Sequence, residues 1–283
     1  MWGKFMKKAK PKIYKYNDII VFLNDVLVFF KDKDKKSLRD LSTELKIANG
    51  LLSMILNRKR NLTEELLLKL LEKFSYNKNE VQFAENLRII SFSQNYQNRK
   101  MAIAKINKLK SYRDFNKNEF ENYKYLSNWY YVAIKEMSDL KDFNEDVEWI
   151  QKRLAYSVNQ KQIDEALTFL KQNEILVYKN KKLVAANKDM NCEEGIFKLT
   201  LSGFHKQILG LAADAIDTIE RDHRRILGHT LTVNENQISE IHNILQEAFE
   251  KIKKINLANP EKASQEVYHV ELVSIPITKK GEK

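Results

Sequence analysis

The chain has 283 residues, of which 43% are hydrophobic and 31% charged, and this composition excludes an intrinsically disordered protein. A single cysteine excludes an internal disulfide and points to a reducing compartment, and no apolar run reaches the roughly 18 residues of a membrane span, so we expect a cytoplasmic protein. The net charge of +11 is uneven, because residues 1–110 hold 24 Lys and Arg against 11 Asp and Glu while the remainder has a small acidic excess. This asymmetry favours a polyanionic partner for the first half.

The first structured element is predicted to be a buried helix. Residues 1–12 read as a basic tail, and an apolar helix is expected from Tyr16 to about Lys31, where Ile, Val, Leu and Phe recur at helical spacing. A charged loop, Lys31–Lys36, follows it.

The stretch Ser37–Leu62, SLRDLSTELKIANGLLSMILNRKRNL, predicts two short helices joined by a turn at Lys46–Ala48 and followed by a basic loop. Ser37 is a good N-cap, and Asp40 completes a capping box. The apolar stripe of the first helix is expected to consist of Leu38, Leu41 and Leu45.

The second helix of the pair, expected from about Asn49 to Asn57, carries the functional prediction. Its inner arc is apolar, whereas its outer arc has small or neutral polar residues and no acid, as a helix that enters a major groove requires. The outer residues expected to face base edges are Asn49, Gly50, Ser53 and Met54. The residues expected mainly to hold phosphates are Asn57, Arg58, Lys59 and Arg60.

The alternative is that the two helices form a hairpin without a binding function, because short amphipathic helix pairs are common.

Two further short helices are predicted after the basic loop. One is capped by Thr63, with Leu66, Leu67, Leu70, Leu71 and Phe74 inside, and the other begins at about Asn79 and buries Val81, Phe83, Leu87 and Ile90.

This part of the chain resembles the Cro/cI-like (Xre-type) helix-turn-helix domains of bacterial regulators. The resemblance lies in the order of its parts, which is a helix, the segment SLRDL, a turn, a second helix, the segment NRKRNLT and a further helix. The turn position that is often Gly in these domains is Lys46 here, so a left-handed conformation there would cost about 1 kcal/mol. Gly50 near the start of the second helix would cost a similar amount in helix propensity.

The second half predicts a winged-helix pattern. An aromatic helix at Tyr123–Leu140 is expected to be core, and helices at Glu145–Leu154 and Asn159–Gln172 are followed by strands at Ile175–Tyr178 and Leu183–Ala186. The helix before the strands exposes Asp164 and Glu165, which repel phosphate, so dimerisation or docking is the function expected of this unit.

The C-terminal part predicts a long helix at Phe197–Arg221 and a strand at Arg225–Val233, then a helix capped by Asn234 that runs to about Ile255 and a strand at Gln265–Thr278. The two strands could pair in a small sheet. Nearly the whole chain resembles a poorly characterised bacterial family in which a helix-turn-helix precedes a domain of unknown function. The segments that carry this resemblance follow the Xre-like domain and are LSNWYYVAIKEM, DVEWIQKRL, RRILGHTLTV and VYHVELVSIPIT.

The sequence contains none of the common nucleotide-binding, zinc-protease or hydrolase motifs, so we expect neither an enzyme nor a cofactor. His223, His229 and Asp222 share a segment but lack further convergent ligands, and Cys192 stands beside Glu193 and Glu194, which disfavour its thiolate.

These inferences predict a mostly α-helical regulator of transcription that binds double-stranded DNA as a homodimer. We expect a basic tail at 1–12, a five-helix helix-turn-helix DNA-binding domain at 13–92, a basic helical connector at 93–118, and an α+β regulatory or dimerisation domain at 119–283 that contains a winged-helix-like unit and a small β-sheet. Two alternatives stay open: a protein–protein adaptor or antitoxin-like module that uses a helix-turn-helix fold, and an effector pocket among Trp129, Tyr130 and Trp149.

Overall fold

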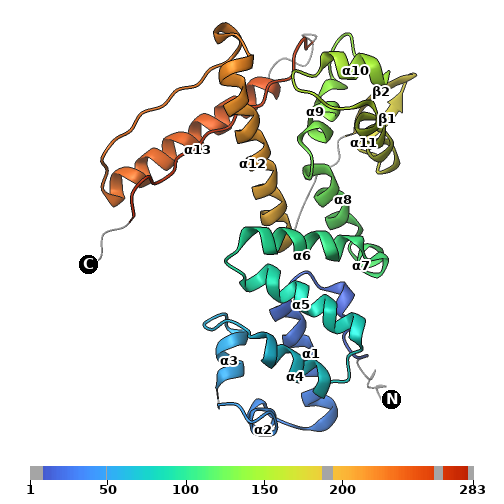
Figure 1. Ribbon diagram of the computed structural model, residues 1–283, viewed down its shortest axis with the longest axis vertical. Coiled ribbons are helices and arrows are strands. Elements are labelled where there is room, and N and C mark those ends of the chain that lie inside the picture. Colours follow the sequence, from blue (N-terminus) through green and yellow to red (C-terminus); the bar gives the residue numbers. More distant parts are fainter. Residues whose placement is uncertain (1–8, 49, 187–193, 258–263, 280–283) are drawn as a thin grey trace, which may run out of the picture. The chain divides into compact units, whose positions relative to one another are not determined.

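The computed structural model describes residues 9–48, 50–186, 194–257 and 264–279. Within these residues the protein is mostly helical, as the sequence predicts, and it has a single two-stranded antiparallel sheet (Figure 1). The chain divides into two compact units. Unit 1 consists of Met1–Lys124 with Met190–Ser202, and unit 2 of Tyr125–Asp189 with Gly203–Lys283.

Unit 1 is an assembly of short helices that begin at side-chain caps. Asp18 caps the first long helix by accepting hydrogen bonds from the backbone N–H groups of Ile20 and Val21, and Thr63 caps the fourth by accepting from Leu66. The helices described in this unit before residue 117 are η1 (Ile13–Lys15), α1 (Ile19–Asp34), α2 (Leu38–Glu44), α3 (Leu51–Leu56), α4 (Glu64–Lys73), α5 (Lys78–Phe92), α6 (Tyr96–Lys108) and α7 (Lys110–Phe115).

The core of unit 1 is one contiguous apolar cluster to which every one of these helices contributes. The inner stripe predicted for α4 is buried in full, from Leu66 to Phe74. Rings meet edge-on within the cluster, for example Phe22 and Tyr76 at 5.3 Å between centroids. This core fixes α3 through Leu52 and Ile55, each 2% exposed, and so determines which face of α3 is left outside.

The stretch 93–118, expected as a connector, forms α6 and α7 and joins the same core. Ala102, Ile103, Ile106 and Tyr112 are buried in it, and α6 packs along α5. The Tyr112 hydroxyl donates to Glu119 at 2.8 Å, and burial raises the pKa of this tyrosine. Asn116 donates to the carbonyl of Tyr14, which ties the start of unit 1 to its later helices.

Unit 2 contains a compact group of three helices and a hairpin. The aromatic stretch Tyr123–Leu140, predicted as one helix, is broken at Ser127–Asn128. Its second part buries Tyr130, Tyr131 and Ile134 and packs against the helix Gln160–Gln172 and the strand Lys182–Ala185. The elements are α8 (Lys117–Leu126, shared between the units), α9 (Trp129–Met137), α10 (Val147–Arg153), α11 (Gln160–Gln172), β1 (Leu176–Lys179) and β2 (Lys182–Ala185).

The hairpin has a two-residue turn with left-handed backbone at both central positions. Asn180 has φ 51° and Lys181 has φ 67°, between the paired residues Lys179 and Lys182. Positive φ at both positions is the pattern of a type I′ turn, whose twist matches that of the flanking strands.

The last part of unit 2 differs from the prediction. Two long helices are present, α12 (Glu194–Thr218) and α13 (Glu235–Leu257), with a short turn η2 (Arg221–His223) between them, and Asn234 caps α13 as expected. The predicted strands Arg225–Val233 and Gln265–Thr278 are wrong, because neither segment takes part in a ladder among the described residues. A β-strand needs a paired neighbour, and among the described residues these segments have none.

The last segment is nonetheless attached to α12 and to the loop after α9. Glu271 lies 2.7 Å from Nδ1 of His205 and 2.9 Å from Nε2 of His269. Leu140 and Ser264 form an isolated parallel bridge.

Candidate nucleic-acid interface

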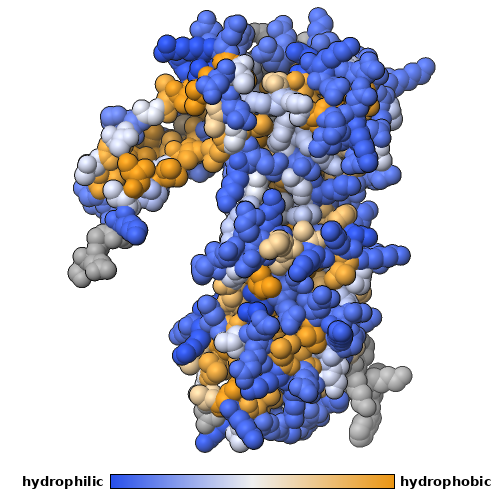
Figure 2. All heavy atoms as spheres, in the orientation of Figure 1, coloured by the Kyte–Doolittle hydropathy of each residue, from blue (hydrophilic) through white to orange (hydrophobic). Residues whose placement is uncertain are grey.

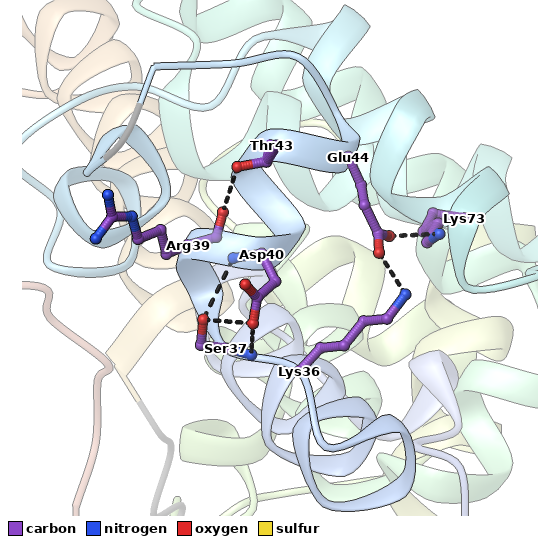
Figure 3. Close-up of polar contacts among 7 residues, drawn as sticks. All are labelled: Lys36, Ser37, Arg39, Asp40, Thr43, Glu44 and Lys73. Atoms are coloured by element: carbon purple, nitrogen blue, oxygen red, sulfur yellow. Dashed lines mark hydrogen bonds and ion pairs between the residues drawn. The ribbon is translucent and has the colours of Figure 1, made fainter.

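The α2–α3 helix pair begins with the predicted capping box. The backbone N–H of Asp40 donates to the Ser37 hydroxyl at 3.3 Å, and the backbone N–H of Ser37 donates to the Asp40 carboxylate at 2.8 Å (Figure 3). The hydrogen bonds from the Ser37 backbone and hydroxyl lower the pKa of Asp40. Two of the backbone N–H groups at the start of α2 are therefore bonded by its own residues.

Lysine side chains on one flank of α2 are already paired. Glu44 accepts from Lys36 and from Lys73, the latter at 2.6 Å, and these two hydrogen bonds lower the pKa of Glu44 (Figure 3). Arg39 lies on the same helix, and its guanidinium points away from this cluster. Among the described residues Arg39 has no ion-pair partner, so its charge is open to an external anion.

Both helices of the pair end in the same turn, with a basic residue in the left-handed conformation. Lys46 has φ 53° and Arg58 has φ 58°. Ile47 N–H donates to Ser42 and Lys59 N–H to Met54, the long-range bonds of a Schellman motif. Lys46 therefore takes the left-handed conformation, at a cost of about 1 kcal/mol for a residue other than glycine.

Gly50 does not lie inside α3, as the sequence suggested, but immediately before it. Its φ is +86°, and the helix begins at Leu51. A Cβ at Gly50 would meet nothing within 4 Å, so the backbone angle and not crowding is what favours glycine here. The turn between the helices thus extends to Gly50, and α3 is shorter than predicted.

The exposed face of α3 carries the small and polar residues that the helical wheel placed there. Ser53 and Asn57 are exposed and close to each other, since the Asn57 side chain donates to the Ser53 carbonyl at 2.8 Å. Met54 is 40% exposed. Asn49 lies outside the described residues.

The three basic residues after α3 are not equivalent. Nη2 of Arg58 lies 2.6 Å from Oδ2 of Asp18, the residue that caps α1, whereas Lys59 and Arg60 are exposed and have no ion-pair partner among the described residues. Arg58 is thus held against the protein. Lys59 and Arg60 are the free cations of this loop.

A shallow hollow of about 290 Å³ lies between α2 and α3. Its lining includes Gly50 and Ser53, which were expected at base edges, and also Arg39 and Leu38, which were not. Leu38 was predicted to be inside with Leu41 but is 40% exposed, because it lies in the first turn of α2, beyond the reach of the core. Arg39 is the residue that sequence reasoning missed; its position on the outer face of the α2 wheel was the available signal.

The structure does not bring together the residues of the other candidate sites, the effector pocket and a metal site, among the residues it describes. Trp129 packs edge-on against Tyr130 and Tyr156, whereas Trp149 packs against Phe143, with ring centroids 5.8 Å apart. In the part of the chain that the structure describes, no three His, Cys, Asp or Glu residues converge on a metal position. Cys192 lies outside the described residues. No helix there is long and apolar enough to cross a bilayer.

Comparison with known proteins gives one family. The model described as "Domain of unknown function (DUF4423)" matches residues 104–276, which is more than half of the chain. The match begins after the α2–α3 pair, so the expected Xre-type kinship of the first domain stays a prediction. No curated protein and no solved structure matches.

Proposed function

The chain belongs to the DUF4423 family, and we propose that it is a transcriptional regulator that binds duplex DNA through α2, α3 and the loop after them. One observation carries the proposal. The exposed side of α3 and the residue at each of its ends present Gly50, Ser53, Met54 and Asn57, and no acidic residue occurs between Leu45 and Thr63. Short side chains without an acid suit base edges in a major groove, where a carboxylate would repel phosphate.

The surrounding basic residues support phosphate contacts on both sides of α3. Arg39 lines the hollow on the α2 side, and Lys59 and Arg60 follow α3. Contacts of this kind fix the register of a protein on DNA without reading sequence. We assign phosphate binding to Arg39, Lys59 and Arg60, and to Arg58 the task of holding the loop against α1.

The group α9, α10, α11 and the β1–β2 hairpin fits a winged-helix unit, and we propose that it serves packing and not DNA reading. The exposed residues of α11 include Asp164 and Glu165, whose charges oppose approach to a duplex.

Selection of binding sites from a random duplex library by the full chain, followed by salt titrations, tests the proposal. Lys59→Ala and Arg60→Ala should weaken binding to all duplexes and reduce the slope of log affinity against log salt by about 0.9 each. Ser53→Ala should weaken the selected site by about 1–3 kcal/mol while leaving random duplex unaffected.

Lys105→Ala is the matched control, because Lys105 is an exposed lysine of α6 and its loss changes the net charge by the same amount. If it flattens the salt slope as much as Lys59→Ala, the assignment of the surface is wrong. If the wild-type chain binds no duplex even at low salt, the adaptor alternative replaces the proposal.

A further inference from the structure

The C-terminal arm, defined as residues 225–278 with α13 at its centre, has no interior. None of its described residues is buried; the last buried residues before it are Ile208 and Ala215 of α12. In proteins most of the stability of an amphipathic helix comes from tertiary packing of its apolar face, and extended segments without paired neighbours are marginal in water. Glu271 and His269 contact α12, but the apolar side chains of the arm remain uncovered among the described residues and require a further surface.

The surface that the arm exposes is strongly apolar. Figure 2 shows apolar side chains along the α13 segment, and three of the largest on this helix are Ile244 at 58%, Phe249 at 43% and Ile255 at 70% exposure. The two extended segments add Leu227 at 85% and Ile275 at 71%. Exposed apolar surface of this extent marks an interface.

The pattern of α13 is that of a helix that packs on another helix. Apolar residues recur with alternating spacings of three and four, the period of a coiled-coil seam. None of the described seam residues is buried, and the seam consists of Ile238, Ile241, Leu245, Ala248, Ile252 and Ile255.

The distribution of charge along α13 indicates which partner can pack against it, and in which direction. The first half of the helix holds Glu235 and Glu240 and no lysine, whereas the second half holds three lysines and two acids, namely Lys251, Lys253, Lys254, Glu247 and Glu250. A parallel copy would bring each half beside itself, whereas an antiparallel copy brings the acids of the first half beside the lysines of the second. Residues 235–246 have a net charge of −2 and residues 247–257 a net charge of +1, so charge favours the antiparallel direction.

From these observations we infer that the arm of a second copy of this chain covers the arm, with the two α13 helices side by side and antiparallel across a two-fold axis. If the axis passes between Gln246 and Glu247, the seam matches itself throughout. Ile238 then comes level with Ile255 of the second copy, Ile241 with Ile252, Leu245 with Ala248, and Glu240 with Lys253. An isologous contact of this kind closes at two copies.

This inference does not depend on DNA binding, and it fails or succeeds separately. The full chain should sediment with about twice its mass of 33.4 kDa at micromolar concentration. Ile241→Glu with Ile252→Glu places charges opposite each other across the seam and should sediment as a monomer, and because neither side chain is buried in the single chain the variant should keep its helical content. Met101→Glu, at an exposed apolar residue with 55% exposure, should remain a dimer.

Spin labels determine the direction of pairing. With the single native cysteine replaced by Cys192→Ser, a label at Glu247 should lie close to its copy, and a label at Ser239 at least about 22 Å from its copy, since 15 residues at 1.5 Å separate the paired levels. Short distances at both positions would indicate parallel helices and overturn the antiparallel arrangement. A wild-type chain that sediments as a monomer would overturn the inference as a whole.

Discussion

Arg58 and Asp18 form an ion pair of 2.6 Å that joins the end of α3 to the start of α1. The same Asp18 carboxylate caps α1 through its other oxygen, so one side chain determines both where α1 begins and where the basic loop lies. This relationship makes Arg58 a positioning residue of the proposed interface and leaves phosphate contacts to its neighbours.

The two functions of Asp18 can be separated by mutation. Asp18→Ala should lower the free energy of unfolding by about 1 kcal/mol through the lost cap, whereas Asp18→Ser keeps a capping oxygen and should lose only a few tenths. Both changes release Arg58, so both should raise affinity for random duplex at low salt. Urea denaturation and a binding titration measure the two effects. Equal stability losses for Ala and Ser would show that the ion pair, and not the cap, is what stabilises this junction.

Two glycine-to-alanine substitutions are predicted to change the free energy of unfolding in opposite directions. Gly50→Ala should destabilise the protein by about 1 kcal/mol, because an alanine at φ +86° is strained even though the space around it is empty. Gly210→Ala, within α12 and also without neighbours, should stabilise by up to about 1 kcal/mol through helix propensity. Thermal or urea unfolding of the two variants gives the comparison. A stabilising Gly50→Ala would mean that α3 starts earlier than Leu51.

The Glu44 cluster should make unit 1 sensitive to acid. The hydrogen bonds from Lys36 and Lys73 lower the pKa of Glu44 below its ordinary value of 4.5. The stabilisation that this carboxylate gives is therefore complete above that value and is lost as the pH falls through the lower pKa of the folded state.

Glu44→Gln should accordingly be less stable than wild type at neutral pH, and the difference should vanish in acid. Glu72→Gln is the control, because Glu72 is exposed on α4 and forms no ion pair among the described residues. Urea midpoints across the acid range provide the measurement. A stability gap that persists in strong acid would indicate that Glu44 acts through packing and not through its charge.

The hairpin turn offers a test of the winged-helix assignment. Lys181→Gly should stabilise by about 0.5–1 kcal/mol, because Asn-Gly is the favoured pair for a type I′ turn and Lys181 has φ 67°. The affinity for DNA and its dependence on salt should not change if the winged-helix-like unit packs against protein and does not contact DNA. Lys181→Ala removes the same charge without relieving the backbone, and a drop in slope of about one in both variants would assign the hairpin to the DNA interface.

Local signals were sufficient for most helices. The capping box at Ser37 and Asp40, the cap at Thr63 and the apolar spacing of α4 each involve residues within one or two turns, and the structure has all three. The outer face of α3 could likewise be read from its wheel, since burial of Leu52 and Ile55 determines which residues remain outside.

The extended segments of the arm are where local reasoning was wrong. The alternation in Gln265–Thr278 describes a chain suited to a sheet, but pairing depends on a neighbour that periodicity cannot supply. Leu38 was likewise assigned to an apolar stripe, whereas its exposure depends on where α2 sits relative to the core.

The sequence by itself determined the helices, their caps and the acid-free face of α3, because these depend on spacing and side-chain chemistry within a few residues. Only the tertiary structure decided that Arg58 is bound to Asp18, 40 positions away, that Arg39 lines the hollow beside Ser53, and that α6 belongs to the core of unit 1. Those contacts join residues distant along the chain, and their formation depends on how whole helices pack.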